Sequence, residues 1–225
     1  MNIEASIAAM RDIITHMMRI MPIVMSVFAL FAGAGVANVS YLFLAFGLIL
    51  VVPVVRAVTN PLFGMLFGAI PAINETLYKV EAGADCSVLG GKATSPEVMV
   101  PSYWWASVVF FGTYILLNAV DMVSFESPAT APANKVQARK AHAGMAIVIV
   151  VVLTAAMLIY RWTAGCETVL GAVIGTVGYS LLGYAWFSLL KVCTNSNMTD
   201  LFGIASRLMP ERDAQERGSI CYPIA

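Results

Sequence analysis

Residues 142–160, HAGMAIVIVVVLTAAMLIY, form an apolar stretch in which no Asp, Glu, Lys or Arg occurs. A helix that crosses the hydrocarbon core of a bilayer needs about 20 mostly apolar residues. Residues 102–124 and 168–190 are also apolar, with Asp121 as their one charged residue, and are bounded by polar or Pro- and Gly-containing segments. These three stretches predict an all-α, polytopic integral membrane protein.

The composition of the chain supports this class and excludes others. Of 225 residues, 60% are hydrophobic and 12% are charged, whereas soluble domains are about 45–50% apolar and about 25% charged. Thirteen basic residues balance thirteen acidic ones, so no net basic field favours nucleic acid. Two histidines and four cysteines without C-x-x-C spacing disfavour haem, iron–sulfur and structural zinc sites. We therefore expect no cofactor, no metal and no nucleic-acid partner.

The apolar stretch at 19–55 is too long for one helix, and GAGVANVS at 33–40 is typical of a tight turn. It predicts a helical hairpin of about 20–36 and 39–57. Residues 61–79, PLFGMLFGAIPAINETLYK, leave two alternatives because they contain Pro71, Asn74 and Glu75. If they cross the membrane the chain has six spans, and if they are re-entrant or interfacial it has five.

The distribution of Lys and Arg distinguishes these topologies, because basic residues collect in cytoplasm-equivalent loops. Five spans give six basic residues on one side and seven on the other, whereas six spans give ten against three. The charge distribution therefore predicts six transmembrane helices with both termini on the cytoplasm-like or matrix-like side. It leaves the endoplasmic reticulum and the mitochondrial inner membrane as alternatives.

Residues 1–18 form an amphipathic pattern that precedes the spans. Apolar residues recur at helical spacing, and Glu4, Arg11, Asp12 and His16 lie between them. The pattern predicts an interfacial helix on the inner surface, with a helical start of the first span as the alternative. The expected organisation is this helix at 1–18, a six-span membrane domain at 19–193 and a polar tail at 194–225.

Six spans bring three distant segments to the outer face: the loop at 80–101, the start of the next span, and the loop at 161–167. Cys86 and Cys166 share this face, whereas Cys193 and Cys221 belong to the inner one. A disulfide in an oxidising compartment and two free thiols are both compatible with this placement.

The segments around this face carry short motifs in chain order. They are AINETLYK at 72–79, MVPS at 99–102, FFGTY at 110–114, and GYAWF at 183–187. With these motifs, residues 62–190 resemble the type 2 phosphatidic acid phosphatase superfamily, in particular its dolichyl-diphosphatase-like branch. The resemblance implies a site with a histidine nucleophile, a second histidine as general acid, and Lys and Arg around the phosphoryl oxygens.

The resemblance also shows where this chain departs from the family. When Trp186 is placed on the family's tryptophan, Arg161 falls on its arginine, Glu167 on its nucleophile and Gly171 on its orienting Asp or Gln. Trp104 stands at the position of the second histidine. A carboxylate repels a phosphate dianion, and an indole has no proton to transfer. The substitutions therefore imply a pseudoenzyme, with no catalytic residue.

Six positions form the vestigial site that the resemblance implies: Lys79, Ser102, Trp104, Arg161, Glu167 and Gly171. Lys79 lies two residues out of the family's register. Lys79 and Arg161 are candidate ligands for an anionic phospholipid headgroup, with interfacial snorkelling as the alternative. The expected partners are membrane lipids and other membrane subunits.

We therefore expect a non-catalytic scaffold subunit of a larger membrane complex. One alternative is a divergent lipid-phosphate or isoprenyl-diphosphate phosphatase that uses Glu167, and another is a channel or transporter that uses Glu75 and Asp121.

Two further patterns predict how the helices meet their surroundings. Tyr103, Trp104 and Trp105 are typical of an interfacial aromatic belt. The small-residue spacing of Gly171 and Gly175 predicts close helix packing.

Overall fold

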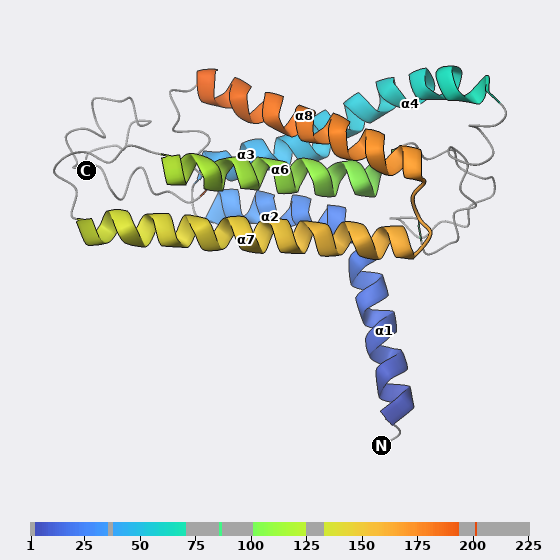
Figure 1. Cartoon of the computed structure of the whole chain (residues 1–225), viewed down its shortest axis with the longest axis horizontal. Coiled ribbons are helices and arrows are strands. Elements are labelled where there is room, and N and C mark those ends of the chain that lie inside the picture. Colours follow the sequence, from blue (N-terminus) through green and yellow to red (C-terminus); the bar gives the residue numbers. More distant parts are fainter. Residues whose placement is uncertain are drawn as a thin grey trace.

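Figure 1 shows the computed structural model, which describes residues 3–35, 38–70, 86, 101–124, 133–193 and 201. The regular elements of these residues are all helical. They are α1 (Ile3–Arg19), α2 (Met21–Gly35), α3 (Val39–Phe46), the π-helical η1 (Gly47–Val51), α4 (Val52–Gly68), α6 (Tyr103–Ser124), α7 (Ala133–Thr163) and α8 (Val169–Cys193).

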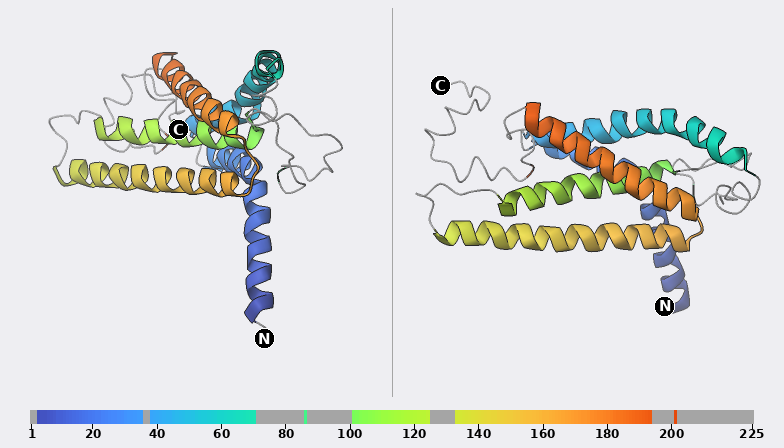
Figure 2. Two further views of the ribbon diagram at one scale, coloured as in Figure 1. Left: turned by 45° about the vertical axis from the view of Figure 1, so that its right-hand side comes forward. Right: turned by 45° about the horizontal axis from the view of Figure 1, so that its top comes forward.

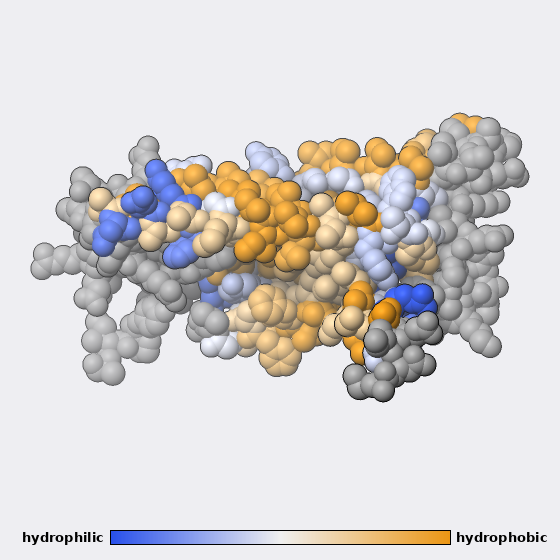
Figure 3. All heavy atoms as spheres, turned by 60° about the horizontal axis from the view of Figure 1, so that its bottom comes forward, coloured by the Kyte–Doolittle hydropathy of each residue, from blue (hydrophilic) through white to orange (hydrophobic). Residues whose placement is uncertain are grey.

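Within the described residues, four helices are long and apolar enough to cross a membrane. The number rises to five when α1 and α2, which meet at a bend of 63°, are counted as one broken span. Figure 3 shows an apolar area in the middle of one face, with hydrophilic residues gathered at one end and a smaller hydrophilic patch toward the other. The all-α membrane class predicted from the apolar stretches is confirmed.

The helix α6 lies at the centre of the bundle, in contact with α7, α8, α2 and α4 (Figures 1 and 2). In its most apolar 18-residue window, 56% of the residues are buried, against 11% in α7. Almost the whole apolar surface of α7 therefore faces outward, toward lipid or another membrane protein.

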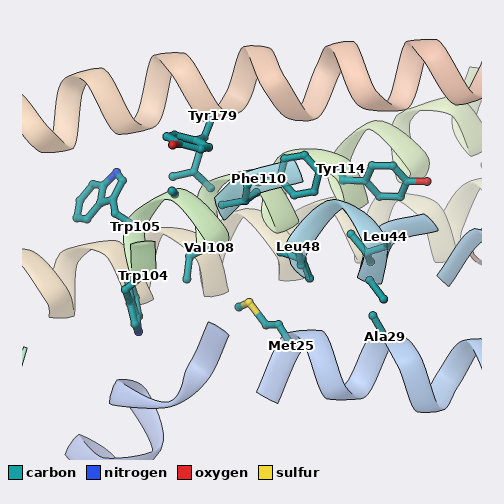
Figure 4. Packing of buried hydrophobic residues seen from close by; sticks show 14 of the residues in the cluster. Met25, Ala29, Leu44, Leu48, Trp104, Trp105, Val108, Phe110, Tyr114 and Tyr179 are labelled. Carbon is teal, nitrogen blue, oxygen red and sulfur yellow. The ribbon is translucent and has the colours of Figure 1, made fainter. Parts of the chain in front are cut away.

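The core forms where α6 packs against α2, α3 and α8 (Figure 4). Trp104, Phe110 and Tyr114 on α6 are buried together with Leu44 on α3 and Tyr179 on α8. Lipid tails are as apolar as these side chains, so close packing and interhelical hydrogen bonds hold the helices together. This requires helices that approach one another closely.

Glycine allows close contact at Gly171 and Gly175, which were predicted from the sequence, and at Gly47, which was not. A Cβ on Gly175 would lie 2.7 Å from the Trp105 ring, and one on Gly171 would lie 2.5 Å from a Glu167 oxygen. A Cβ on Gly47 would lie 2.6 Å from the Phe110 ring. The predicted close helix packing is therefore confirmed at Gly175, which meets the start of α6, whereas Gly171 makes room for the preceding Glu167 and Thr168.

The second helix of the predicted hairpin extends well beyond residue 57. The elements α3, η1 and α4 form one helical path from Val39 to Phe67 that includes Pro53 and Pro61. Pro53 has no N–H to donate, and the wider π-helical turn lies directly before it, with the Val52 N–H bonded to the Gly47 carbonyl. The helix therefore continues past a residue that usually interrupts one.

This continuity changes the path of the chain. Residues 61–68, which we assigned to a separate span, belong to α4, and residues 71–79 lie outside the described residues. The start of α2 and the end of α8 lie at opposite ends of the bundle (Figure 1). The described helices give four spans, or five when α1 and α2 count as one broken span, which is the alternative number left open by the sequence. The side of the membrane on which the termini lie stays a prediction.

The remaining predicted boundaries agree with the structure except at the start of α7. The helices α6 and α8 begin within one residue of the predicted spans. The helix α7 begins at Ala133 instead of His142, so Lys135, Arg139 and Lys140 lie in its first turns instead of a loop. Arg139 is buried there.

The helix α1 projects sideways from the bundle, with its C-terminal end near the place where α6 begins and α7 ends (Figures 1 and 2). The Trp104 Nε1 donates a hydrogen bond to the Met18 carbonyl (2.6 Å), and the Tyr160 hydroxyl donates one to Thr15 Oγ1 (3.1 Å). The bend between α1 and α2 excludes a straight helical start of the first span. It also places α1 at the end opposite to the one we expected.

Candidate functional site

Five of the six residues of the predicted vestigial site lie together at this end of the bundle. Ser102 precedes α6 and Trp104 lies in its first turn, while Arg161 lies in the last turn of α7. Glu167 lies in the α7–α8 loop and Gly171 in the first turn of α8. We name these five residues the Arg161 cluster. Lys79 lies outside the described residues.

A disulfide joins two loops beside the cluster. Cys86 and Cys166 are bonded, with their Cα atoms 5.3 Å apart, so the segment between α4 and α6 is linked to the α7–α8 loop. Of the two alternatives left open by the sequence, the structure therefore has the disulfide. Such bonds persist in oxidising compartments. Cys193, which lies at the opposite end of the bundle, is a free thiol.

Arg161 is buried between this disulfide and an aromatic ring. Its guanidinium donates a hydrogen bond to the Cys86 carbonyl and lies 5.2 Å from the centroid of the Trp104 ring. A cation above an indole face is stabilised by the ring's quadrupole, and more strongly when water is excluded. Only 4% of Arg161 and 1% of Trp104 are exposed. The arginine therefore makes its main contacts inside the protein.

The burial of Trp104 and Trp105 corrects the predicted interfacial aromatic belt. Trp105 is also buried, and its Nε1 donates a hydrogen bond to Thr176 Oγ1 on α8 (3.0 Å). The three aromatic residues begin α6, and α6 is central in the bundle. Two of the rings consequently pack against other helices instead of the membrane surface.

Glu167 and Ser102 together cap the N-terminus of α6. The Ser102 Oγ accepts a hydrogen bond from the Trp105 N–H (3.1 Å), as an N-cap side chain does. The Ser102 N–H in turn donates to Glu167 Oε1 (3.2 Å). A carboxylate at this position is also favoured by the positive end of the helix dipole. Glu167 therefore joins α6 to the α7–α8 loop.

The protonation of Glu167 is set mainly by its burial. Burial raises the pKa of the Glu167 carboxyl to about 7, against the opposing effects of the Ser102 hydrogen bonds and the positive charges of Arg161 and Arg56. Its second oxygen, Oε2, is buried and has no hydrogen-bond partner within the described part of the chain. The group is therefore close to half protonated at neutral pH.

Gly171 provides the space that this carboxylate occupies. The Cβ of any other residue would overlap Glu167 Oε1 and lie 2.8 Å from Thr168 Oγ1. The Gly171 N–H donates a hydrogen bond to that Thr168 hydroxyl (2.8 Å), which begins α8. An Asp or Gln, as the resemblance would place here, has no room beside Glu167.

A small cavity lies between the cluster and α1. Its volume is about 30 Å³, enough for one or two water molecules. This cavity is smaller than a phospholipid headgroup, and contact of Lys79 and Arg161 with such a headgroup stays a prediction. The walls of the cavity come from α1, α6, α7 and the α7–α8 loop: Thr15, Met18, Arg19, Trp104, Tyr160, Arg161, Ala164 and Cys166.

The contribution of α1 to this cavity was missed from the sequence because we placed α1 on the other face of the membrane. No local signal marks Thr15, Met18 or Arg19 as neighbours of Arg161. His16 lies on the same helix, at the end of the bundle that holds the Arg161 cluster. Its side chain is exposed and does not line the cavity.

The acids considered for a transport pathway are not brought together. Asp121 forms an ion pair with Lys191 at the other end of the bundle, and Glu75 lies outside the described residues. Among the described side chains, no group of three or more His, Cys, Asp or Glu residues could hold a metal ion.

No family model matches this chain, and neither the curated proteins nor the solved structures include a significant match. Chemically, the cluster combines a buried cation beside a cavity of water size with a buried carboxyl group whose pKa is about 7. Such an arrangement can join helices and exchange a proton.

Proposed function

We propose that this protein is a non-catalytic, phosphatase-like membrane protein that serves as a structural subunit of a larger membrane assembly. The observation that carries the proposal is that Arg161 and Glu167 are buried and bonded within the protein, Arg161 to the Cys86 carbonyl and Glu167 to the Ser102 N–H, and that the cavity beside Arg161 is of water size. In a lipid-phosphate phosphatase, the corresponding groups must be available to the substrate.

The state of Arg161 supports this proposal. An arginine that binds a phosphoryl group presents its fork of N–H donors to the oxygens. Here one of those donors is bonded to the Cys86 carbonyl and the face of the guanidinium lies over Trp104. A phosphate could reach it only if the disulfide-linked segment and the indole both moved.

The outer surface of α7 is the surface most available to a partner. Its exposed apolar residues include Met145, Val148, Val152 and Ile159, and almost none of its apolar window is covered within the chain. A scaffold subunit needs such a helix to contact lipid and neighbouring spans.

The experiment is to isolate the full-length, affinity-tagged chain from its native membranes in mild detergent and to identify what co-purifies by mass spectrometry. We expect the chain to migrate within a large complex that contains the same membrane proteins in fixed ratio. A second multi-span protein from the same membranes, with the same tag, is the control for non-specific association. A monodisperse chain with no such proteins would contradict the proposal.

A second candidate, a divergent lipid-phosphate phosphatase, is favoured by one observation. The buried Glu167 carboxyl has a pKa of about 7 and an oxygen without a partner in the described part of the chain. In this scheme the carboxylate attacks the terminal phosphorus and the bond from phosphorus to the lipid's oxygen breaks. The lipid alcohol, or the lipid phosphate in the case of a diphosphate, takes a proton from water as it leaves, and a further water hydrolyses the acyl phosphate to inorganic phosphate and the carboxylate.

The two candidates differ in a hydrolysis assay on the purified chain in nanodiscs that contain phosphatidate or an isoprenyl diphosphate. The structural proposal expects no phosphate release above empty nanodiscs. Release that is lost in Glu167→Gln but kept in Asp121→Asn, a matched change of an acid at the other end, would establish the phosphatase instead.

A further inference from the structure

The helix α1 carries an apolar face that no other described part of the chain covers. Five of its large apolar side chains are each between 46% and 62% exposed: Ile7, Met10, Ile13, Ile14 and Met17. At helical spacing these residues occupy one side of α1, while Asp12 and His16 lie on the other. An apolar row of this kind is unfavourable in water.

The direction of α1 indicates what covers this row. The bundle helices define the membrane normal, because their apolar surfaces are long enough to cross the bilayer. The helix α1 bends by 63° from α2 and projects sideways from the bundle, near the end where α6 begins (Figures 1 and 2). A helix with this direction lies along the membrane plane, at the level where the spans end.

The apolar row of α1 is also continuous with a surface that faces lipid. On the far side of the bend, α2 exposes Ile23, Val24, Val27, Phe28, Leu30 and Phe31. Met17 near the end of α1 and Ile23 near the start of α2 are both exposed, on either side of the bend. Exposed apolar residues therefore follow the chain from α1 into α2.

The charges of α1 indicate which kind of lipid surface fits. Its sequence, IEASIAAMRDIITHMMR, contains two acidic residues and two arginines. A helix that depends on anionic lipids carries an excess of Lys and Arg, and α1 does not. Its binding must depend on the apolar row.

We propose that α1 is an interfacial helix that inserts its apolar face into a zwitterionic lipid surface on the disulfide-bearing side of the membrane. The helix rests there with its polar side toward water. The hydrogen bonds from Tyr160 to Thr15 and from Trp104 to Met18 hold its C-terminal half against the bundle. The proposal is independent of whether the chain is a scaffold or a phosphatase.

The test measures the depth of nitroxide spin labels on the full-length chain in phosphatidylcholine nanodiscs. The labels are placed at Met10→Cys and, as the matched control on the opposite side of the helix, at Asp12→Cys. Both variants carry Cys193→Ser and Cys221→Ser, so that only the introduced thiol reacts. Collision with oxygen reports contact with lipid, and collision with a water-soluble nickel complex reports contact with water.

We expect the ratio of oxygen to nickel accessibility to be several-fold higher at residue 10 than at residue 12. The values should be unchanged when about a third of the lipid is anionic. A second pair, Ile14→Cys and His16→Cys, repeats the comparison one turn later and protects the test against a single misfolded variant.

Three results would overturn the proposal. Equal access of the nickel complex to both labels would mean that α1 projects into water. Protection of residue 10 from both reagents would mean that protein, such as a second copy, covers the row. A difference that appears only with anionic lipid would mean that charge, and not the apolar face, holds α1 to the membrane.

Discussion

The two ends of the helix bundle are held together by different kinds of contact. At the disulfide end, Arg161 and Glu167 are buried and bonded to Cys86 and Ser102. At the other end, the Asp121–Lys191 ion pair is exposed. Asn118 is buried there and accepts a hydrogen bond from the Leu201 N–H (3.1 Å).

This difference determines how each end should respond to a mutation. When a buried polar group loses its hydrogen-bond partner, the protein loses stability by the full cost of desolvating that group. When an exposed charged group loses its ion-pair partner, water takes the partner's place and little stability is lost. Loss of a partner of Arg161 or Glu167 should therefore cost more stability than loss of the Asp121–Lys191 pair, although Arg139 and Asn118 are buried at the end that holds this pair. The following variants test that contrast.

The largest effect is expected from Trp104→Ala. It removes a fully buried ring that packs against Arg161 and donates a hydrogen bond to Met18. Removal of a buried Trp costs about 3–5 kcal/mol, measured by denaturation of the full chain in detergent micelles. Trp162→Ala is the control, since Trp162 is 44% exposed. An equal loss of unfolding free energy in both variants would contradict the burial of Trp104.

Removal of the disulfide should have the next largest effect. Cys86 and Cys166 are 80 residues apart, so their bond restricts a long segment of the unfolded chain. The double variant Cys86→Ser, Cys166→Ser should lose about 2–4 kcal/mol of unfolding free energy. Cys193→Ser, a change of the free thiol, should lose almost nothing. A mobility on non-reducing gels that does not change with reductant would show that the bond is not formed.

The pH dependence of stability should reveal Glu167. Its pKa is raised from an ordinary value of 4.5 to about 7 in the folded protein, so the folded state binds the proton more tightly than the unfolded state. The resulting stabilisation is complete below about pH 4.5 and is lost as the pH rises to about 7. The loss is about 3 kcal/mol at most.

The control for this pH dependence is Glu167→Gln, which keeps the shape of the side chain but does not titrate. Between these pH values its unfolding free energy should vary less than that of the unmodified chain. If both chains showed the same slope, another group would be responsible for the dependence.

The smallest effect is expected at the opposite end. Asp121→Asn removes the ion pair with Lys191. The side chain of Asp121 is 34% exposed and that of Lys191 is 43% exposed. The loss should be below about 1 kcal/mol and should diminish further in high salt. A double-mutant cycle with Lys191→Gln measures the pair itself. A coupling as large as the loss in Trp104→Ala would contradict the contrast between the two ends.

Part of the Arg161 cluster was predicted from the sequence and part of it was not. The start of α6, the α7–α8 loop and the start of α8 were expected on one face, and the structure brings them together. The contribution of α1 was missed, because its position depended on the number of spans. That number depended on whether the helix from Val39 ended near residue 57 or continued to Phe67.

The burial of the residues in the Arg161 cluster could not be predicted from the sequence either. The position of Trp104 at the start of a span is typical of an interfacial residue, yet its ring is buried between Arg161 and Met18. Whether a residue at the end of a span faces lipid or protein depends on which helices surround it. A one-dimensional pattern does not contain this information.

The sequence by itself determined the membrane class, the turn near residues 33–40, three spanning helices and the pair of cysteines able to meet. These follow from local hydropathy and from the short reach of a loop. Only the tertiary structure decided that α3 and α4 form one helical path, that α1 lies at the disulfide end, and that Arg161 is bonded within the protein. Those outcomes depend on packing between segments that are distant in the sequence. This packing allows a helix to continue past prolines, and it decides whether a given residue is buried or exposed.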